Sequence, residues 1–241
     1  MLKPSRFDVL GSAISDRPPF FEDSHFEAMS PPAESVSCYL KDLTQQLVQT
    51  STELVSTADT LRQTASVAYA TDKIWGKPGI WSREDDLSPL KLMGPLAHAL
   101  LSMPRLEPQQ NYISPVSYIC ELSRLAMLIL LAATKRFYSF FSIELKPMES
   151  RFASLLMKQA AFNRNTFPNL QLWAVLLVAS IQPLSANRPL YIMHIVALMD
   201  ILELKSTTAA HSMAKSILWT DAVAGAKFDQ SFIEIIDRTL H

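Results

Sequence analysis

The side chains that could carry acid–base or nucleophilic chemistry are few and lie far apart along the chain. The histidines are His25, His98, His194, His211 and His241. His194 and Asp200 fall on one expected helix, but their six-residue spacing does not place them on one face, so they form no obvious general-base dyad. The sequence contains no Gly-x-Ser-x-Gly, His-Glu-x-x-His, phosphate-binding glycine loop or dinucleotide fingerprint. We therefore expect no catalytic residues; an enzyme with catalytic groups dispersed along the chain is the alternative.

The sequence also gives little support for metal binding or for thiol chemistry. His25 lies among acidic residues at positions 22–27, but no ligand spacing repeats, and a solvated loop is the preferred interpretation. The two cysteines, Cys38 and Cys120, are too few and too far apart for a disulfide framework or a zinc site. The sequence predicts no bound metal and no cofactor.

Binding of a small apolar molecule is a further chemistry that the residue types allow. Methionine and aromatic side chains recur through the second half of the chain, at Met127, Phe137, Tyr138, Phe140, Phe141, Phe152, Met157, Trp173, Tyr191, Met193 and Met199. A crevice among such side chains could hold an apolar ligand, with His98 and His194 as candidate pocket residues. Ordinary core packing explains the same residues, and we expect it in preference.

Composition limits the class of partner. The chain has 241 residues, 49% of them hydrophobic and 19% charged, with a formal net charge of −1. It lacks the basic excess that nucleic-acid-binding domains usually show. The two most apolar stretches, Leu125–Ala133 and Leu172–Ile181, fall short of the roughly 20 residues of a membrane span, so we expect buried core helices and no membrane partner.

The chain divides into a leader at 1–35 and a helical domain at 36–241. The leader holds five of the 15 prolines and several acidic residues, a composition that predicts a flexible segment. From Ser35 to about Ala70 the pattern predicts one long amphipathic helix. Leucines recur in it every seven residues, at Leu40, Leu47, Leu54 and Leu61.

The leucine repeat allows two interpretations. Threonines occupy the alternate seam at positions 50, 57 and 64, whereas a coiled coil needs apolar residues at both seam positions. We therefore expect the helix to pack on its own domain, and keep it as a candidate interaction helix for a dimer zipper.

Helix starts are marked along the rest of the chain. Proline, which is favoured in a first helical turn, begins segments at Pro115, Pro147, Pro168 and Pro189, and Ser206 is placed to cap another. Long stretches of strict alternation are absent, and five glycines offer little material for tight hairpins. The sequence predicts an all-α fold, a single multi-helix domain of seven to nine helices.

Four phrases occur in an order that resembles the fungal-specific transcription factor domain. They are "HALLSMPR" (98–105), "YICELSRLAMLILLAATKRFY" (118–138), "FPNLQLWAVLLVASI" (167–181) and a closing segment that runs from Arg-Pro at 188–189 to 236. The resemblance covers about residues 90 to 237. The residues that match the family phrases are Trp173, Arg188, Pro189, Leu218, Trp219 and Asp221.

The resemblance implies an all-helical regulatory domain that acts in transcription. Trp219 would be a core anchor, and Asp221 a cap or turn residue that satisfies backbone N–H groups. The family's zinc-cluster module needs six cysteines, which this sequence does not have, so we expect no direct sequence-specific DNA binding. The implied partners are a zinc-cluster transcription factor, a coactivator or a second copy.

The family context also suggests a place of action. A nuclear regulator of a fungal secondary-metabolite gene cluster is the function implied, with the cytoplasm as the alternative location. The competing hypothesis is a helical small-molecule-binding module, or a pathway enzyme built on the same fold.

Overall fold

The computed structural model describes residues 12, 15, 17–19, 36–75, 88–106, 113–138, 144–158, 165–182, 185–225 and 233–237. The expected flexible leader therefore lies almost entirely outside the described residues. Within them the protein is all-α: it has eight helices of 11 or more residues and no strand. The predicted fold class and helix number are confirmed.

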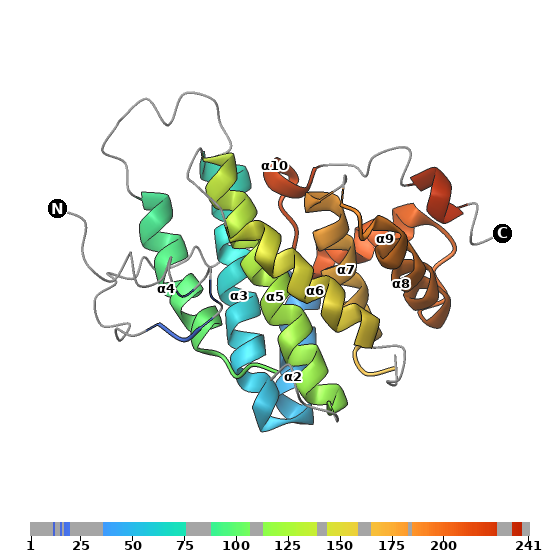
Figure 1. Cartoon of the computed structure of the whole chain (residues 1–241), viewed down its shortest axis with the longest axis horizontal. Coiled ribbons are helices and arrows are strands. Elements are labelled where there is room, and N and C mark those ends of the chain that lie inside the picture. Colours follow the sequence, from blue (N-terminus) through green and yellow to red (C-terminus); the bar gives the residue numbers. More distant parts are fainter. Residues whose placement is uncertain are drawn as a thin grey trace.

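The helices form one body. The long ones are α2 (Cys38–Thr50), α3 (Val55–Ala70), α4 (Ser88–Ser102), α5 (Pro115–Phe137), α6 (Leu145–Lys158), α7 (Pro168–Ile181), α8 (Arg188–Ile201) and α9 (Thr207–Ile217). Of these, α4 lies towards one end of the long axis of the body and α8 towards the other (Figure 1). Short turns add η3 (Thr52–Leu54), the π-helical η4 (Thr71–Trp75) and α10 (Asp221–Ala224). A further helical turn covers residues 233–237.

The core is built around α5 and α7. Every residue of α5 from Glu121 to Thr134 is buried, and so is every residue of α7 from Leu170 to Ala179. α5 is long and apolar enough to cross a membrane, but 83% of its apolar window is buried inside the protein. Because α3, α4, α6 and α7 pack around it, α5 is the core helix that the sequence predicted.

Several predicted helix starts are confirmed by their caps. The Ser114 hydroxyl accepts a hydrogen bond from the Ser117 N–H, with Pro115 in the first turn. The Ser206 hydroxyl likewise accepts from the Ala209 N–H at 3.2 Å. Each such side chain satisfies a backbone donor that the first helical turn leaves without a partner.

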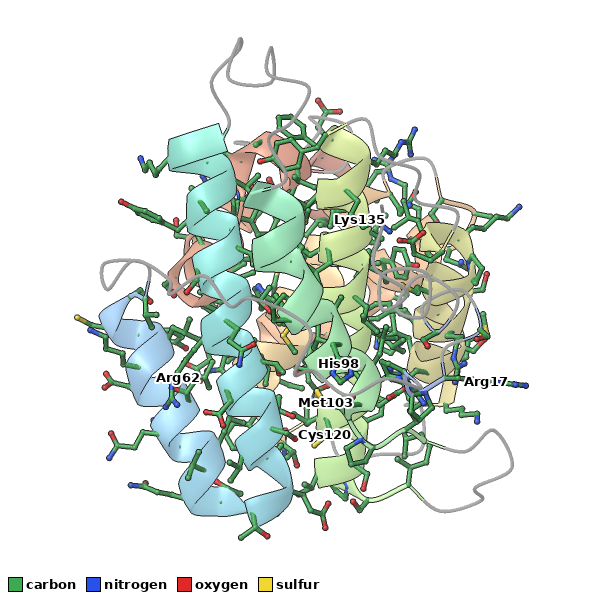
Figure 2. All side chains as sticks on the ribbon, turned by 90° about the vertical axis from the view of Figure 1, so that its left-hand side faces the viewer. Arg17, Arg62, His98, Met103, Cys120 and Lys135 are labelled. Atoms are coloured by element: carbon green, nitrogen blue, oxygen red, sulfur yellow. The ribbon has the colours of Figure 1, made fainter. Side chains whose placement is uncertain are left out.

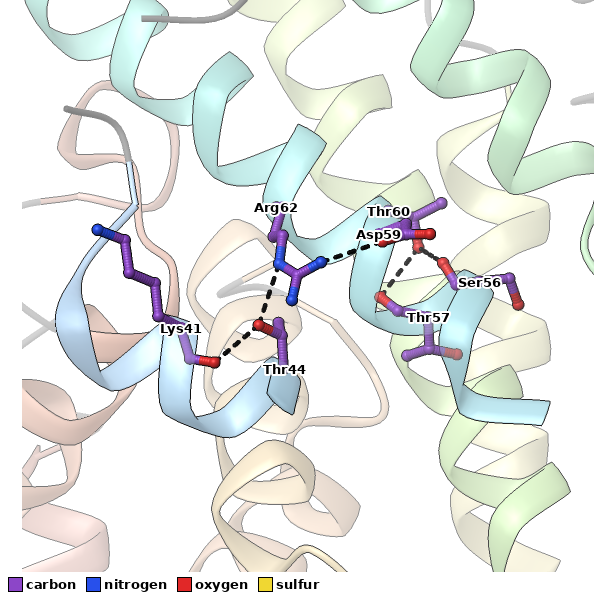
Figure 3. Close-up of polar contacts among 7 residues, drawn as sticks. All are labelled: Lys41, Thr44, Ser56, Thr57, Asp59, Thr60 and Arg62. Carbon is purple, nitrogen blue, oxygen red and sulfur yellow. Dashed lines mark hydrogen bonds and ion pairs between the residues drawn. The ribbon is translucent and has the colours of Figure 1, made fainter. Parts of the chain in front are cut away.

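The segment predicted as one long helix is instead a pair of helices. Ser51 has an extended backbone (φ −159°, ψ 141°), and its hydroxyl accepts from the Glu53 N–H, so α2 ends there and the chain turns through η3 into α3. α3 then folds back along α2. Arg62 of α3 bridges the pair, because its Nε donates to Thr44 Oγ1 at 3.1 Å while Nη1 contacts Asp59 Oδ1 at 3.1 Å (Figure 3).

The repeating leucines face the core of this chain. Leu40, Leu47, Leu54 and Leu61 are each 0% exposed, so none is available to a partner. The dimer-zipper interpretation is therefore wrong, and packing on the protein's own domain is correct. Thr44, Thr57, Thr60 and Thr64 of the same helices are buried as well, whereas Thr50 is exposed. The buried Thr60 Oγ1 donates to the Ser56 carbonyl at 2.8 Å (Figure 3).

Candidate functional site

Helix α8 carries two apolar stripes. Its inner stripe, Tyr191, His194, Ile195, Leu198 and Met199, is buried against the rest of the protein. The outer stripe has the same spacing of three and four residues and consists of Pro189, Ile192, Met193, Val196 and Ala197. Since residues three and four apart share one face of a helix, α8 is apolar on two opposite sides. Only one of these sides can face the core.

The outer stripe forms the floor of a surface groove of about 680 Å³, here called the α8 groove. Ile235, from the helical turn at 233–237, lines it as well. Met193 is 52% exposed and Ile235 is 42% exposed. Arg188 and the exposed Asp200 lie at its two ends, on the first and the last turn of α8.

A polar cluster holds the beginning of α8 in place. The Tyr191 hydroxyl donates to Glu149 Oε1 of α6 at 3.3 Å, and the Ser185 hydroxyl donates to the same oxygen. The Ser185 hydroxyl also accepts from the Asn187 N–H at 3.0 Å. Burial, and then the Glu149 carboxylate, raise the pKa of Tyr191, so its hydroxyl remains a hydrogen-bond donor. The end of the groove near Arg188 is therefore fixed to α6.

The two histidines predicted for a ligand pocket do not meet. His98 lies on α4, which packs on α3 and α5, whereas His194 is buried on α8, which packs on α7 and α6. Figure 1 places α4 and α8 at opposite ends of the long axis, and Figure 2 labels His98 on the α4 side. The prediction of one pocket with both histidines is therefore not supported.

The candidate crevice of methionine and aromatic residues is largely packed core. Met127, Phe152, Trp173, Tyr191 and Met199 are buried, as ordinary packing predicts. Met157, Phe137 and Met193 are exposed, and of these Met193 lines the α8 groove. Phe140 and Phe141 lie outside the described residues.

The tryptophans of the family phrases are structural anchors. The Trp173 side chain is 0% exposed, and its indole N–H donates to the Leu218 carbonyl at 2.7 Å. Trp219 is 9% exposed, and its indole N–H donates to the Gly225 carbonyl at 2.9 Å. Its ring packs edge-on against the His211 ring, with 4.9 Å between the ring centroids. Trp219 is a core anchor, as predicted. Trp173 thus ties the segment between α9 and α10 to α7, and Trp219, which lies in that segment, ties it to the end of α10.

The capping function predicted for Asp221 is performed by a different aspartate. Asp72 of η4 reaches α10, where its carboxylate accepts from the Asp221 and Ala222 N–H groups at 3.0 Å each and from the Thr220 hydroxyl at 2.7 Å. Asp221 instead makes an ion pair with Lys215 at 2.7 Å on the surface. The sequence prediction missed Asp72 because it is 149 residues away from the helix that it caps.

The buried ionisable groups of α5 are paired with one another or kept neutral. Arg124 and Glu121 form a two-point ion pair, with Nε to Oε2 and Nη2 to Oε1 both at 2.8 Å. Cys120 donates from Sγ to the Glu53 carbonyl at 3.6 Å, and burial raises the pKa of its thiol. Because the thiolate is the nucleophile, this thiol is not activated for attack.

Clusters of metal-ligand type are not found in the part of the chain that the structure describes. No group of three or more histidine, cysteine, aspartate or glutamate side chains is placed to hold an ion there. His25 and its acidic neighbours lie outside that part. The α8 groove, whose lining is mostly apolar, is therefore taken as the candidate binding surface among the described residues.

Comparison with known proteins did not find a relative of this chain. No protein-family model matches the sequence, and no curated protein or solved structure is significantly similar to it.

Proposed function

We propose that this protein is a regulatory domain that acts in transcription through protein–protein contacts, with the α8 groove as its contact surface. The observation that carries the proposal is the exposed outer stripe of α8. Exposed apolar surface on a soluble protein usually marks an interaction site, and methionine is enriched at the centres of protein interfaces. Met193 lies in the middle of the stripe and is half exposed.

The transcription part of the proposal rests on the resemblance of four sequence phrases to the fungal-specific transcription factor domain. The same resemblance is the support for proposing a nuclear location and a secondary-metabolite gene cluster as the target. A net charge of −1 favours recruitment to DNA by a partner, such as a zinc-cluster protein or a coactivator, over direct binding.

A tethering experiment tests the proposal. The full chain is fused to an unrelated DNA-binding domain in a fungal cell, and a reporter gene that carries the matching site is measured. We expect the fusion to change reporter expression in either direction. Met193→Glu should remove most of this change because it puts a charge into the apolar groove.

The matched control for this experiment is Met157→Glu. Met157 lies on α6, is 61% exposed and does not line the groove, so the same substitution there should leave the reporter response intact. A fusion without any effect on the reporter would reject the transcription proposal. Equal effects of the two variants would reject the groove as its contact surface.

Direct DNA binding is tested separately. The purified chain should bind duplex DNA no more tightly than nonspecific proteins do, with Kd values of about 10⁻⁴ to 10⁻⁶ M at physiological salt. Tight, sequence-dependent binding would contradict recruitment through a partner.

A small-molecule function is the second candidate, because the groove volume of about 680 Å³ falls within the range of ligand sites. Native mass spectrometry of the chain purified from a fungal host would test it. Retention of a stoichiometric apolar compound by the wild type, and its loss in Met193→Glu, would favour this function over the regulatory one.

A further inference from the structure

We infer that the occupant of the α8 groove is the same helix of a second copy, packed antiparallel across a twofold axis. The inference rests on the proposed function in that both assign the groove to a protein contact. It goes further because it names the partner and its orientation.

The charges at the ends of the groove are self-complementary. Arg188 lies in the first turn of α8 and the exposed Asp200 lies in its last turn, 12 residues later. At a rise of 1.5 Å per residue these positions are about 18 Å apart along the axis. An antiparallel pair places Arg188 of each copy opposite Asp200 of the other. A parallel pair would bring the two arginines together at one end and the two aspartates together at the other.

The apolar residues between these charges match about the same centre. The midpoint of positions 188 and 200 is position 194, so within the outer stripe Ile192 of one copy meets Val196 of the second copy, and the reverse, while Met193 lies next to this centre. Ala197 is small, which lets the two axes approach. The twofold operation that gives these pairs produces an isologous interface, in which one patch serves both subunits. Opposed helix dipoles favour the same orientation.

Arg188 can serve this contact and also keep a partner within its own chain. A guanidinium carries five N–H donors in a planar fork, so one edge can bind inside the protein while the other meets a carboxylate. The Asp200 carboxylate is exposed and has no hydrogen-bond or ion-pair partner among the described residues. It is therefore available to a second copy.

The size of the surface sets the expected strength. One pair of 14-residue helices with Ile235 at its margin is at the small end of the range of protein interfaces, below about 1,200 Å² in total. Interfaces of this size are transient. We therefore expect a reversible dimer that populates at micromolar concentrations, not a permanent one.

The first test is sedimentation equilibrium of the full chain from roughly 1 to 200 µM, a range that brackets weak association. The wild type should pass from monomer to dimer within it. Met193→Glu should weaken the dimer by about tenfold or more, because two charges are then buried in an apolar contact. Met157 is 61% exposed, against 52% for Met193, and lies outside the groove, so Met157→Glu should dimerise as the wild type does.

Charge reversal then tests the orientation. Asp200→Arg alone gives two arginine–arginine contacts in an antiparallel dimer and should weaken it by about tenfold; Arg188→Asp alone should do the same through two aspartate–aspartate contacts. An equimolar mixture of the two variants should form a heterodimer at least as tight as the wild-type dimer, since both ends then pair opposite charges. Aspartate in the first turn and arginine in the last turn both suit the helix dipole, and Asp200→Arg removes no partner within the described chain. Thermal unfolding checks that both variants fold.

Three results would overturn the inference: a wild type that stays monomeric, a dimer that Met193→Glu does not weaken, and a variant mixture that does not associate. The first result together with an intact reporter response would mean that another protein occupies the groove. In that case the inference fails and the proposed function stands. A wild-type dimer without any reporter response would support the inference and reject the proposed function in transcription.

Discussion

Helices α7 and α8 are alike in length and apolar composition but have different surroundings. Both have 14 residues, both have proline in the first turn, and both consist mainly of apolar residues. α7 packs against α5, α8, α9 and α10 and is buried from Leu170 to Ala179, whereas α8 packs mainly on α7 and α6 and leaves Met193 half exposed. A helix that is apolar all round is normally enclosed. Within the described part of the chain, packing does not explain why the exposed side of α8 is apolar.

The largest expected effect concerns the enclosed helix. Trp173→Ala in α7 should lower the free energy of unfolding by about 3–5 kcal/mol, because it empties a large volume that the surrounding helices cannot refill. Trp173→Phe keeps most of the volume and loses the hydrogen bond to the Leu218 carbonyl, so it should cost about 1–3 kcal/mol. Urea unfolding followed by circular dichroism measures both. Equal, small effects would mean that α7 is less enclosed than described.

A comparison of two methionines tests the difference within α8 itself. Met199 is 0% exposed on the inner stripe, and Met199→Ala should cost about 2–5 kcal/mol. Met193→Ala, on the outer stripe, should change the unfolding free energy of the monomer by no more than about 0.5 kcal/mol. Chemical denaturation at a protein concentration below the dimer range measures the two values. A large loss for Met193→Ala would place that side chain in a packed contact within the chain.

The next effect concerns α10, one of the elements that cover α7. Asp72→Ala removes the carboxylate that caps α10 and should cost about 0.5–2 kcal/mol, as the loss of other helix caps does. Asp221→Ala removes only a surface ion pair with Lys215 and should cost less, about 0–1 kcal/mol. Hydrogen exchange of the α7 amides should become faster in the first variant and stay nearly unchanged in the second. A larger effect of Asp221→Ala than of Asp72→Ala would mean that Asp221 caps α10.

The smallest effect is a pH dependence at α9, which also covers α7. Burial, and then the Lys215 charge, lower the pKa of His211 from its usual 6.5, while Asp221 opposes them. The folded protein therefore prefers the neutral imidazole. The stability that this group contributes is complete above pH 6.5 and decreases as the pH falls below that value. Unfolding curves from pH 7.5 to 5 should show this slope in the wild type, and His211→Gln should reduce it. An unchanged slope would assign the effect to other groups.

Much of the fold could be predicted because its signals are local. Ser114 and Ser206 cap helices through bonds to residues three positions away, and Pro168 and Pro189 lie in first turns, as expected. The core helices α5 and α7 are recognisable from their apolar composition. Such signals depend on spacings within one helical turn, which the sequence displays directly.

The features that the sequence did not predict depend on contacts between residues far apart in the chain, or on which of two similar apolar patterns the core covers. The long-helix prediction for 35–70 failed at Ser51, where an extended backbone ends α2 although the leucine spacing continues across the break. The cap of α10 comes from Asp72, far away along the chain. Both stripes of α8 have helical spacing, so the sequence alone cannot tell which of them the core will cover.

The Asp72 cap also has a consequence for the order in which the protein forms. Its three bonds join residues 148–150 positions apart, so the ring of chain that they close spans well over half of the protein. Closing so large a ring has an entropic cost that local helix formation does not have. During synthesis Asp72 leaves the ribosome long before Thr220 does, and the η4 carboxylate stays hydrated until the last fifth of the chain arrives. The attachment of α10 is therefore a late event, and a chain that stops before it would leave this side of α7 without its cover.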